Sequence, residues 1–269
     1  MADFLRHYLL AVQFFTRIPV TGALGAWVGF SPAMLRASAA HFPGVGWLVG
    51  AVVAGFSALL MAALPSNVFT PLVAAVWGTA LGVLVTGAFH EDGLADVADG
   101  LGGTQNRERA LLIMKDSRVG AFGAIAVALV LMGKVSVLAL LGSSSATTLC
   151  TALFLGHVVS RSWPLLLIRL LPHVGDDAGS KSKPLADQIT PGSLGVAFLW
   201  CFGALALVMY AQSAINLLAI GLGLLLSAAA FFVMWRWFAL RLQGFTGDCL
   251  GATQQACEVA FYLGWCLAL

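Results

Sequence analysis

The stretch that decides the fold is residues 68–103, VFTPLVAAVWGTALGVLVTGAFHEDGLADVADGLGG. Its first part is hydrophobic and reaches the length of about 20 residues that a helix needs to cross a bilayer. Its second part places four carboxylates within nine residues, those of Glu91, Asp92, Asp96 and Asp99. A span that leads straight into clustered acids predicts a helical membrane protein with an anionic site at one end of its bundle.

The composition extends this prediction to the whole chain. Of its 269 residues, 60% are hydrophobic and only 10% are charged, and the mean hydropathy is +0.93. A soluble domain carries about 25% charged residues. Two long segments, 37–90 and 188–235, contain no Asp, Glu, Lys or Arg. We therefore expect an integral membrane protein, and the net charge of +2 is too small to indicate a nucleic-acid partner.

Hydrophobic windows divide the chain into about seven transmembrane helices. Residues 4–15 are too short and too polar to cross and predict an interfacial amphipathic helix. No repeat with a fixed period is visible, so residues 1–269 are expected to form one domain. The predicted fold is an all-α, polytopic membrane bundle with a short acidic helix after the second span. The seven windows are 43–64, 68–90, 119–142, 146–171, 194–214, 216–238 and 250–269.

The charges of the connecting segments are distributed asymmetrically. Three connections carry no charge, at 65–67, 142–145 and 211–213. The segments on the other side hold most of the Lys and Arg residues, and they are 91–118, 172–193 and 236–248. The positive-inside rule then places this side and the N-terminus in the cytoplasm, and the C-terminus outside.

The acidic run is the strongest candidate for a functional site. In a helix, steps of about 100° put Asp92, Asp96 and Asp99 within an arc of about 60°. Like charges on one face repel, so a cation should compensate them, and Mg²⁺ suits this role because it takes oxygen ligands and bridges to phosphates. A solvated loop is the simpler alternative, but the nearby glycines favour a site that a ligand approaches closely.

Basic residues follow the acidic run at the edge of the next span. Lys115 and Arg118 are candidates for contact with phosphate oxygens, which Arg can bind in two-point geometry. Asp116 between them is a candidate metal or substrate ligand. Salt bridges with the neighbouring acids, or a role in topology alone, are the alternatives.

Polar residues also occur inside the later spans. The last span carries a polar stripe, which should face the bundle interior because exposure to lipid is costly. Its members Asp248 and Glu258 are candidate substrate-binding residues, with a structural hydrogen-bonding stripe as the alternative. Arg161, in the fourth span, either contacts a phosphate or an acid, or reaches the interface as a structural residue. Lys134 is expected to be structural.

Taken together, these motifs resemble the cobalamin synthase family. The matches occur in order from one end of the chain to the other, in a chain of the family's length. They are Phe14-Phe15-Thr16-Arg17-Ile18-Pro19, Phe42-Pro43-Gly44-Val45-Gly46, His90-Glu91-Asp92-Gly93-Leu94-Ala95-Asp96 with Asp99-Gly100-Leu101-Gly102-Gly103, Met114-Lys115-Asp116-Ser117-Arg118-Val119-Gly120 with Gly123, and Thr246-Gly247-Asp248 with Gly251-Ala252 and Glu258.

The resemblance implies a Mg²⁺-dependent enzyme of the bacterial or archaeal cytoplasmic membrane. Such an enzyme joins adenosylcobinamide-GDP to α-ribazole, or to α-ribazole 5′-phosphate, and releases GMP. Its partners would be these two substrates and the lipid bilayer, and the sequence leaves open whether it forms a homo-oligomer.

The site residues follow from combining this reaction with the motifs. Mg²⁺ would be held by Glu91, Asp92, Asp96 and Asp99, with Asp92, Asp96 and Asp99 as the catalytic set. Asp99 is the first choice for the base that accepts the proton of the attacking ribose hydroxyl. The substrate would be bound by Lys115, Asp116, Arg118, Arg161, Asp248 and Glu258.

Three other kinds of protein remain as alternatives. A CDP-alcohol phosphotransferase uses similar physics, but its pattern has an Arg where this chain has Asp96, and a membrane prenyltransferase would need a denser second acid cluster. A cation transporter would place its carboxylates near the middle of the bilayer and often has repeated halves. This chain gathers its acids at one face.

Overall fold

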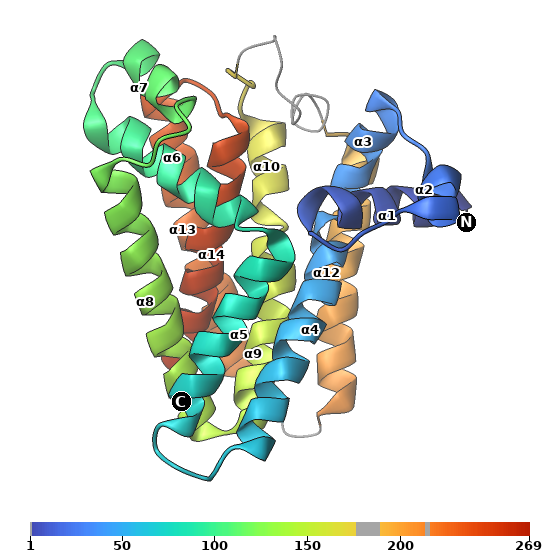
Figure 1. Cartoon of the computed structure of the whole chain (residues 1–269), viewed down its shortest axis with the longest axis vertical. Helices are drawn as coiled ribbons and strands as arrows, with labels where there is room; N and C mark the ends of the chain where they lie inside the picture. The colour runs from blue at the N-terminus through green and yellow to red at the C-terminus, as the bar shows by residue number, and fades with distance from the viewer. Residues whose placement is uncertain (1, 176–188, 213–215) are drawn as a thin grey trace.

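The computed structural model describes residues 2–175, 189–212 and 216–269, and within these residues the protein is a bundle of helices without a named strand (Figure 1). The N-terminal part consists of α1 (Ala2–Phe15), α2 (Gly22–Val28), α3 (Pro32–Ser38) and the 3₁₀ turn η1 (Ala39–His41). The predicted helix at 4–15 is confirmed as α1, which lies across the bundle in Figure 1.

The long helices run along the vertical axis of Figure 1. Two short helices, α6 and α7, lie at the upper end, and the C-terminus lies at the lower end. The remaining helices are α4 (Phe42–Ala63), α5 (Thr70–Thr86), α6 (Phe89–Gly103), α7 (Arg107–Met114), α8 (Ala121–Ser144), α9 (Ala146–Ser160), α10 (Trp163–Leu170), α12 (Pro191–Ala211), α13 (Leu217–Arg241) and α14 (Gly247–Cys266).

Five stretches of the described chain are long and apolar enough to cross a membrane, which confirms a polytopic membrane protein. They are Pro32–Ala63, Ala121–Ser144, Ala146–Leu170, Pro191–Ala211 and Leu217–Arg241, and the pair α5 and α6 adds a sixth only if its two halves are counted as one bent span. The prediction of seven spans exceeds this number. The window 68–90 yields α5 with 17 residues, and the window 250–269 yields α14, which the polar stripe makes less apolar than a simple span.

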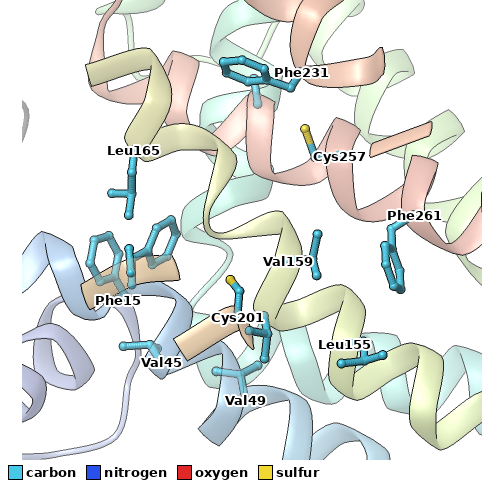
Figure 2. Packing of buried hydrophobic residues seen from close by; sticks show 14 of the residues in the cluster. Phe15, Val45, Val49, Leu155, Val159, Leu165, Cys201, Phe231, Cys257 and Phe261 are labelled. Carbon is cyan, nitrogen blue, oxygen red and sulfur yellow. The ribbon is translucent and has the colours of Figure 1, made fainter. Parts of the chain in front are cut away.

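The span formed by α9 and α10 lies at the centre of the bundle. Within it, 83% of the residues are buried, compared with 17% for α8, which is largely exposed at the surface of the bundle. Figure 2 shows Val45 and Val49 of α4 on one side of α9 and Cys257 and Phe261 of α14 on the other. The central position of α9 means that its polar residues must find partners inside the protein.

A sharp bend separates α5 from α6. The two helix axes differ by 90°, and the chain turns at Gly87 and Ala88, whose φ angles are 67° and 59°. Gly87 adopts this left-handed conformation without cost, whereas Ala88 does so under strain. The backbone N–H of Arg17 donates to the carbonyl of Val85 (2.7 Å) and so holds α1 against the end of α5. The bend turns the acidic helix α6 out of the direction of the spans and across the upper end of the bundle (Figure 1).

Helix α6 crosses the start of α14 at very short range. A Cβ atom at Gly93 would lie 2.7 Å from the backbone oxygen of Asp248, and one at Gly251 would lie 3.2 Å from the backbone of His90. Small residues allow the two helix backbones to approach in this way. The imidazole of His90 stacks on the ring of Phe42, so His90 has a packing role at this contact.

We predict that Gly93→Ala separates α6 from α14, because the added methyl group meets backbone atoms that cannot rotate away. The expected loss is about 1–3 kcal/mol in the free energy of unfolding, measured in detergent micelles. Gly55→Ala is the matched control, since a Cβ there meets nothing within 4 Å. Equal stability of the two variants would contradict the close crossing.

Candidate active site

Three carboxylates face one another where α6 crosses α14. Asp92 is exposed and Asp96 is half-buried on α6, and Asp248 begins α14. Burial, together with the charges of Asp248, Asp92 and Asp99, raises the pKa of Asp96 to about 7. Burial also raises the pKa of Asp248, and the charge of Asp92 adds to this effect. The acids are therefore close enough to repel one another.

This repulsion suits a divalent cation. Among the described residues, no three acidic, histidine or cysteine side chains are gathered closely enough to hold a metal ion by themselves. Mg²⁺ does not require such a cage, because it commonly binds one or two carboxylates and completes its shell with water and substrate phosphates. The oxygen donors of Asp92, Asp96 and Asp248 fit this mode of binding.

Asp99, the predicted general base, binds the start of α8. Its two carboxylate oxygens accept hydrogen bonds from the backbone N–H groups of Gly120 (2.7 Å) and Gly123 (2.8 Å). These amides belong to the first turn of α8, which has no side-chain cap of its own. Both oxygens of Asp99 are therefore occupied by the amides that begin α8.

The loop before α8 brings the predicted phosphate-binding residues to the same end of the bundle. Arg118 donates to both carboxylate oxygens of Asp116, at 2.6 Å for the shortest contact, and this hydrogen bonding lowers the pKa of Asp116 to about 2. The Arg118 side chain is 87% exposed, and such surface pairs contribute little to stability. Lys115 lies in the same loop and also has a partner. A phosphate can therefore displace the Asp116–Arg118 pair at small cost.

Glu258 lies in the interior of the bundle, and its charge is already compensated. Its Oε1 atom contacts Lys134 Nζ of α8 at 2.6 Å and accepts a hydrogen bond from the Tyr262 hydroxyl (2.8 Å). Its Oε2 atom accepts a hydrogen bond from Gln254 Nε2 (2.6 Å). Glu258, a predicted substrate-binding residue, thus has a protein partner for each of its oxygens, and only 1% of the residue is exposed. Lys134 is structural, as predicted.

Arg161 and Glu91 belong to the same interior. Arg161 is 1% exposed and donates to the ring and the carbonyl of His157, and its guanidinium lies over the ring of Phe42. Glu91 is buried, and its Oε1 atom accepts a hydrogen bond from Gln255 Nε2 (2.9 Å). Arg161 and Glu91, which the sequence predicts to bind substrate and metal, are therefore both buried and bonded to other groups of the protein.

Two arginines that the sequence did not single out hold the far end of α6 and the loop after it. Arg241, in the last turn of α13, donates to the carbonyls of Leu101 (3.3 Å) and Thr104 (2.5 Å). Arg107 of α7 donates to the carbonyl of Leu242 (2.6 Å). A cation near the end of a helix is the signal that could have indicated these contacts.

A cavity of about 20 Å³ adjoins Gly247 and His90 between aromatic side chains of α1, α4 and α6. Since a water molecule needs roughly 10–15 Å³, this cavity is too small for a nucleotide. Asp92 lies exposed on the outward face of α6.

Comparison with known proteins identifies the family of this chain. The family model described as cobalamin-5-phosphate synthase matches residues 7–266. The chain belongs to this family. Two similar proteins, both named adenosylcobinamide-GDP ribazoletransferase, come from Albidiferax ferrireducens (68% identity) and Polaromonas naphthalenivorans (61%), and each alignment covers all of both chains. A protein of the same name from Vibrio cholerae is 40% identical over 98% of this chain and 95% of its own. No solved structure matches the chain.

We predict that Asp96→Asn stabilises the protein at pH 8 when divalent cations are removed by EDTA. With a pKa of about 7 in the folded protein and an ordinary value of 3.8, Asp96 keeps its proton in the folded state over a range where the unfolded chain has lost it. Stability therefore falls as pH rises from about 4 to 7. The variant should unfold at a higher temperature than the parent at pH 8 and at nearly the same temperature at pH 4. A lower unfolding temperature for the variant at pH 8 would contradict the repulsion.

We also predict that Lys134 and Glu258 depend on each other. Either Lys134→Met or Glu258→Gln should cost about 3–5 kcal/mol in the free energy of unfolding, because it leaves one buried charge without its partner. The double variant should be more stable than the sum of the two losses allows. Unfolding in mixed detergent micelles measures all three, and simple additivity would show that the two charges do not interact.

Proposed function

We propose that this protein is an adenosylcobinamide-GDP ribazoletransferase, which forms adenosylcobalamin, or its 5′-phosphate, in the assembly of the cobalamin nucleotide loop. The observation that carries the proposal is the outward face of α6, where Asp92 and Asp96 meet Asp248, in a chain of the cobalamin-5-phosphate synthase family. The relatives named for this activity are similar to the chain over its whole length.

The reaction breaks the phosphoanhydride bond of the diphosphate and forms a new phosphate ester. A ribose hydroxyl of α-ribazole attacks the phosphorus atom that carries the cobinamide group. The bond from this phosphorus to GMP breaks, and GMP leaves with the bonding electron pair. The hydroxyl proton passes to a base. The main demands on the protein are to position two substrates and to balance the negative charge of the diphosphate.

Asp92 and Asp96 are the residues that would hold Mg²⁺, with Asp248 close by. When bound, the ion would neutralise the diphosphate and the charge that develops on the leaving group. Arg118 and Lys115 approach from the loop before α8, and Asp99 keeps this loop next to α6 through its hydrogen bonds to Gly120 and Gly123. Arg118 exchanges its pairing with Asp116 for a substrate phosphate.

Asp248 replaces Asp99 as the proposed base. Its carboxylate receives a hydrogen bond from the Thr246 hydroxyl (3.2 Å), which orients it at the start of α14. Burial raises its pKa and so makes it a stronger base than a solvated carboxylate. Asp248 also differs from Asp99 in that backbone amides of α8 do not occupy its two oxygens.

We place this site on the cytoplasmic side of a bacterial or archaeal inner membrane. The charged segments that accompany α6 support this orientation through the positive-inside rule. Lipid surrounds the bundle, whose outer helices expose large apolar side chains such as Leu129 of α8 and Phe202 of α12. The transporter alternative is disfavoured, because the buried carboxylates among the described residues are bound by other groups of the protein. Glu258 pairs with Lys134, Glu91 binds Gln255, and Asp99 binds the backbone amides of Gly120 and Gly123.

The direct test is an assay of the purified protein with adenosylcobinamide-GDP, α-ribazole and Mg²⁺. We expect release of GMP that requires all three components, and loss of at least 100-fold in rate for Asp92→Asn, by analogy with the loss of a group that stabilises charge in the transition state. Release of GMP is measured by chromatography.

Glu108→Gln is the matched control. Glu108 is an exposed acid at the same end of the bundle, where it pairs only loosely with Arg107 (3.8 Å). Its variant should keep the activity of the parent. Absence of turnover with every divalent metal would reject the function, and equal rates for Asp92→Asn and the parent would remove Asp92 from the site.

A further inference from the structure

A buried polar network runs beneath α6 and ends at Glu91, the residue before Asp92. It begins at the Lys134–Glu258 pair and passes through Gln254, whose Nε2 atom donates to Glu258 (2.6 Å) and to Ser160 Oγ (3.0 Å). Gln255 continues it, because its Nε2 atom donates to Gln254 Oε1 (3.0 Å) and to Glu91 Oε1 (2.9 Å). The network thus runs from α8 through α14 to α6.

Gln255 is the member that joins this network to α6. It is 2% exposed, and its amide holds the carboxylate of Glu91 inside the bundle. The other Glu91 oxygen, Oε2, is buried without a hydrogen-bond partner in the described structure. Burying a carboxylate with so few partners costs free energy. Loss of the hydrogen bond from Gln255 would therefore favour movement of Glu91 out of the bundle.

Glu91 and Asp92 are consecutive on α6, so their side chains point about 100° apart around the helix. Any rotation of α6 that releases Glu91 from Gln255 turns Asp92 and Asp96 by the same angle. The position of Glu91 inside the bundle thereby fixes the rotation of α6 about its axis, and with it the direction in which the side chains of Asp92 and Asp96 point. Arg161, whose charge interacts with Glu91, favours the same inward position.

We propose that Gln255 is a positioning residue for the cation site, which acts through Glu91 and the rotation of α6 and does not touch substrate or metal. The proposal rests on the proposed function, because that function supplies the cation. Groups that orient metal ligands from outside the coordination shell typically change metal affinity by about 10–100-fold when they are removed.

The test measures Mn²⁺ binding to the full-length protein in detergent by electron paramagnetic resonance, without substrate. Gln255→Leu has a similar volume and removes both donated hydrogen bonds, and we expect it to weaken Mn²⁺ binding at least tenfold. Ser160→Ala is the matched control, since it breaks the bond from Gln254 to α9 and leaves the Gln255–Glu91 bond in place. Its Mn²⁺ affinity should stay within twofold of the parent.

A second variant separates positioning from ligation and serves if Gln255→Leu does not fold. The exchange Glu91→Gln with Gln255→Glu keeps one amide and one carboxylate at the same two positions. We expect this double variant to recover Mn²⁺ affinity to within threefold of the parent, whereas Glu91→Gln alone should not.

Three outcomes would overturn the proposal. The first two are unchanged Mn²⁺ affinity in Gln255→Leu, and a loss of Mn²⁺ affinity in Ser160→Ala as large as that in Gln255→Leu. The third is failure of the Glu91→Gln, Gln255→Glu double variant to recover Mn²⁺ affinity, which would make Glu91 a ligand. Failure of the proposed function would appear separately, as absence of GMP release by the parent protein, and leaves the Mn²⁺ comparison intact.

Discussion

The rest of this structure depends on how the carboxylates of α6 are held by the protein itself. Glu91 binds Gln255 inside the bundle, and Asp99 binds the first backbone amides of α8. These contacts lie near the two ends of α6, and Arg241 binds the carbonyls at its far end. A short helix with little apolar surface is unstable alone. Its position across the end of the bundle therefore comes from these polar anchors and from its close packing at Gly93.

The acids of this protein divide into two groups by their surroundings. Glu91, Asp99 and Glu258 are buried and hydrogen-bonded to the protein, so their charges are used in folding. Asp92, Asp96 and Asp248 remain at the edge of the bundle, where burial, together with the neighbouring negative charges, raises the pKa of Asp96. The second group tolerates this repulsion because the first group holds the helices together. A site under electrostatic strain of this kind is typical of functional surfaces.

Burying charged groups beneath the candidate active site costs free energy. Polar partners at the end of the central helix α9 offset part of this cost. His157, Ser160 and Arg161 come from this helix, and all three lie against the polar stripe of α14. Each charge is expensive to bury, and removal of one partner is more harmful than removal of both. The network consequently favours one arrangement of α6, α8, α9 and α14 over alternatives in which a charge would face lipid.

The sequence by itself determined that the chain is a helical membrane protein, together with its amphipathic first helix, its acidic helix and its family, because hydrophobic length, local charge and ordered motifs are properties of contiguous residues. It overestimated the number of spans, since α5 is short and α14 carries a polar stripe. It also indicated Asp92 and Asp96 as neighbours on one helical face, since helical periodicity relates them directly.

Only the tertiary structure decided which polar residues are buried. The helix wheel placed Asp99 with the other aspartates, but the start of α8 lies against that point of α6 and uses both oxygens. Likewise, residue type and spacing do not show that Arg161 and Glu258 are buried. Arg161 donates to the ring and the carbonyl of His157, and Glu258 pairs with Lys134 of α8, a helix far from α14 along the chain. Burial and pairing are set by the three-dimensional neighbours of a side chain, and residue type and spacing alone do not specify them.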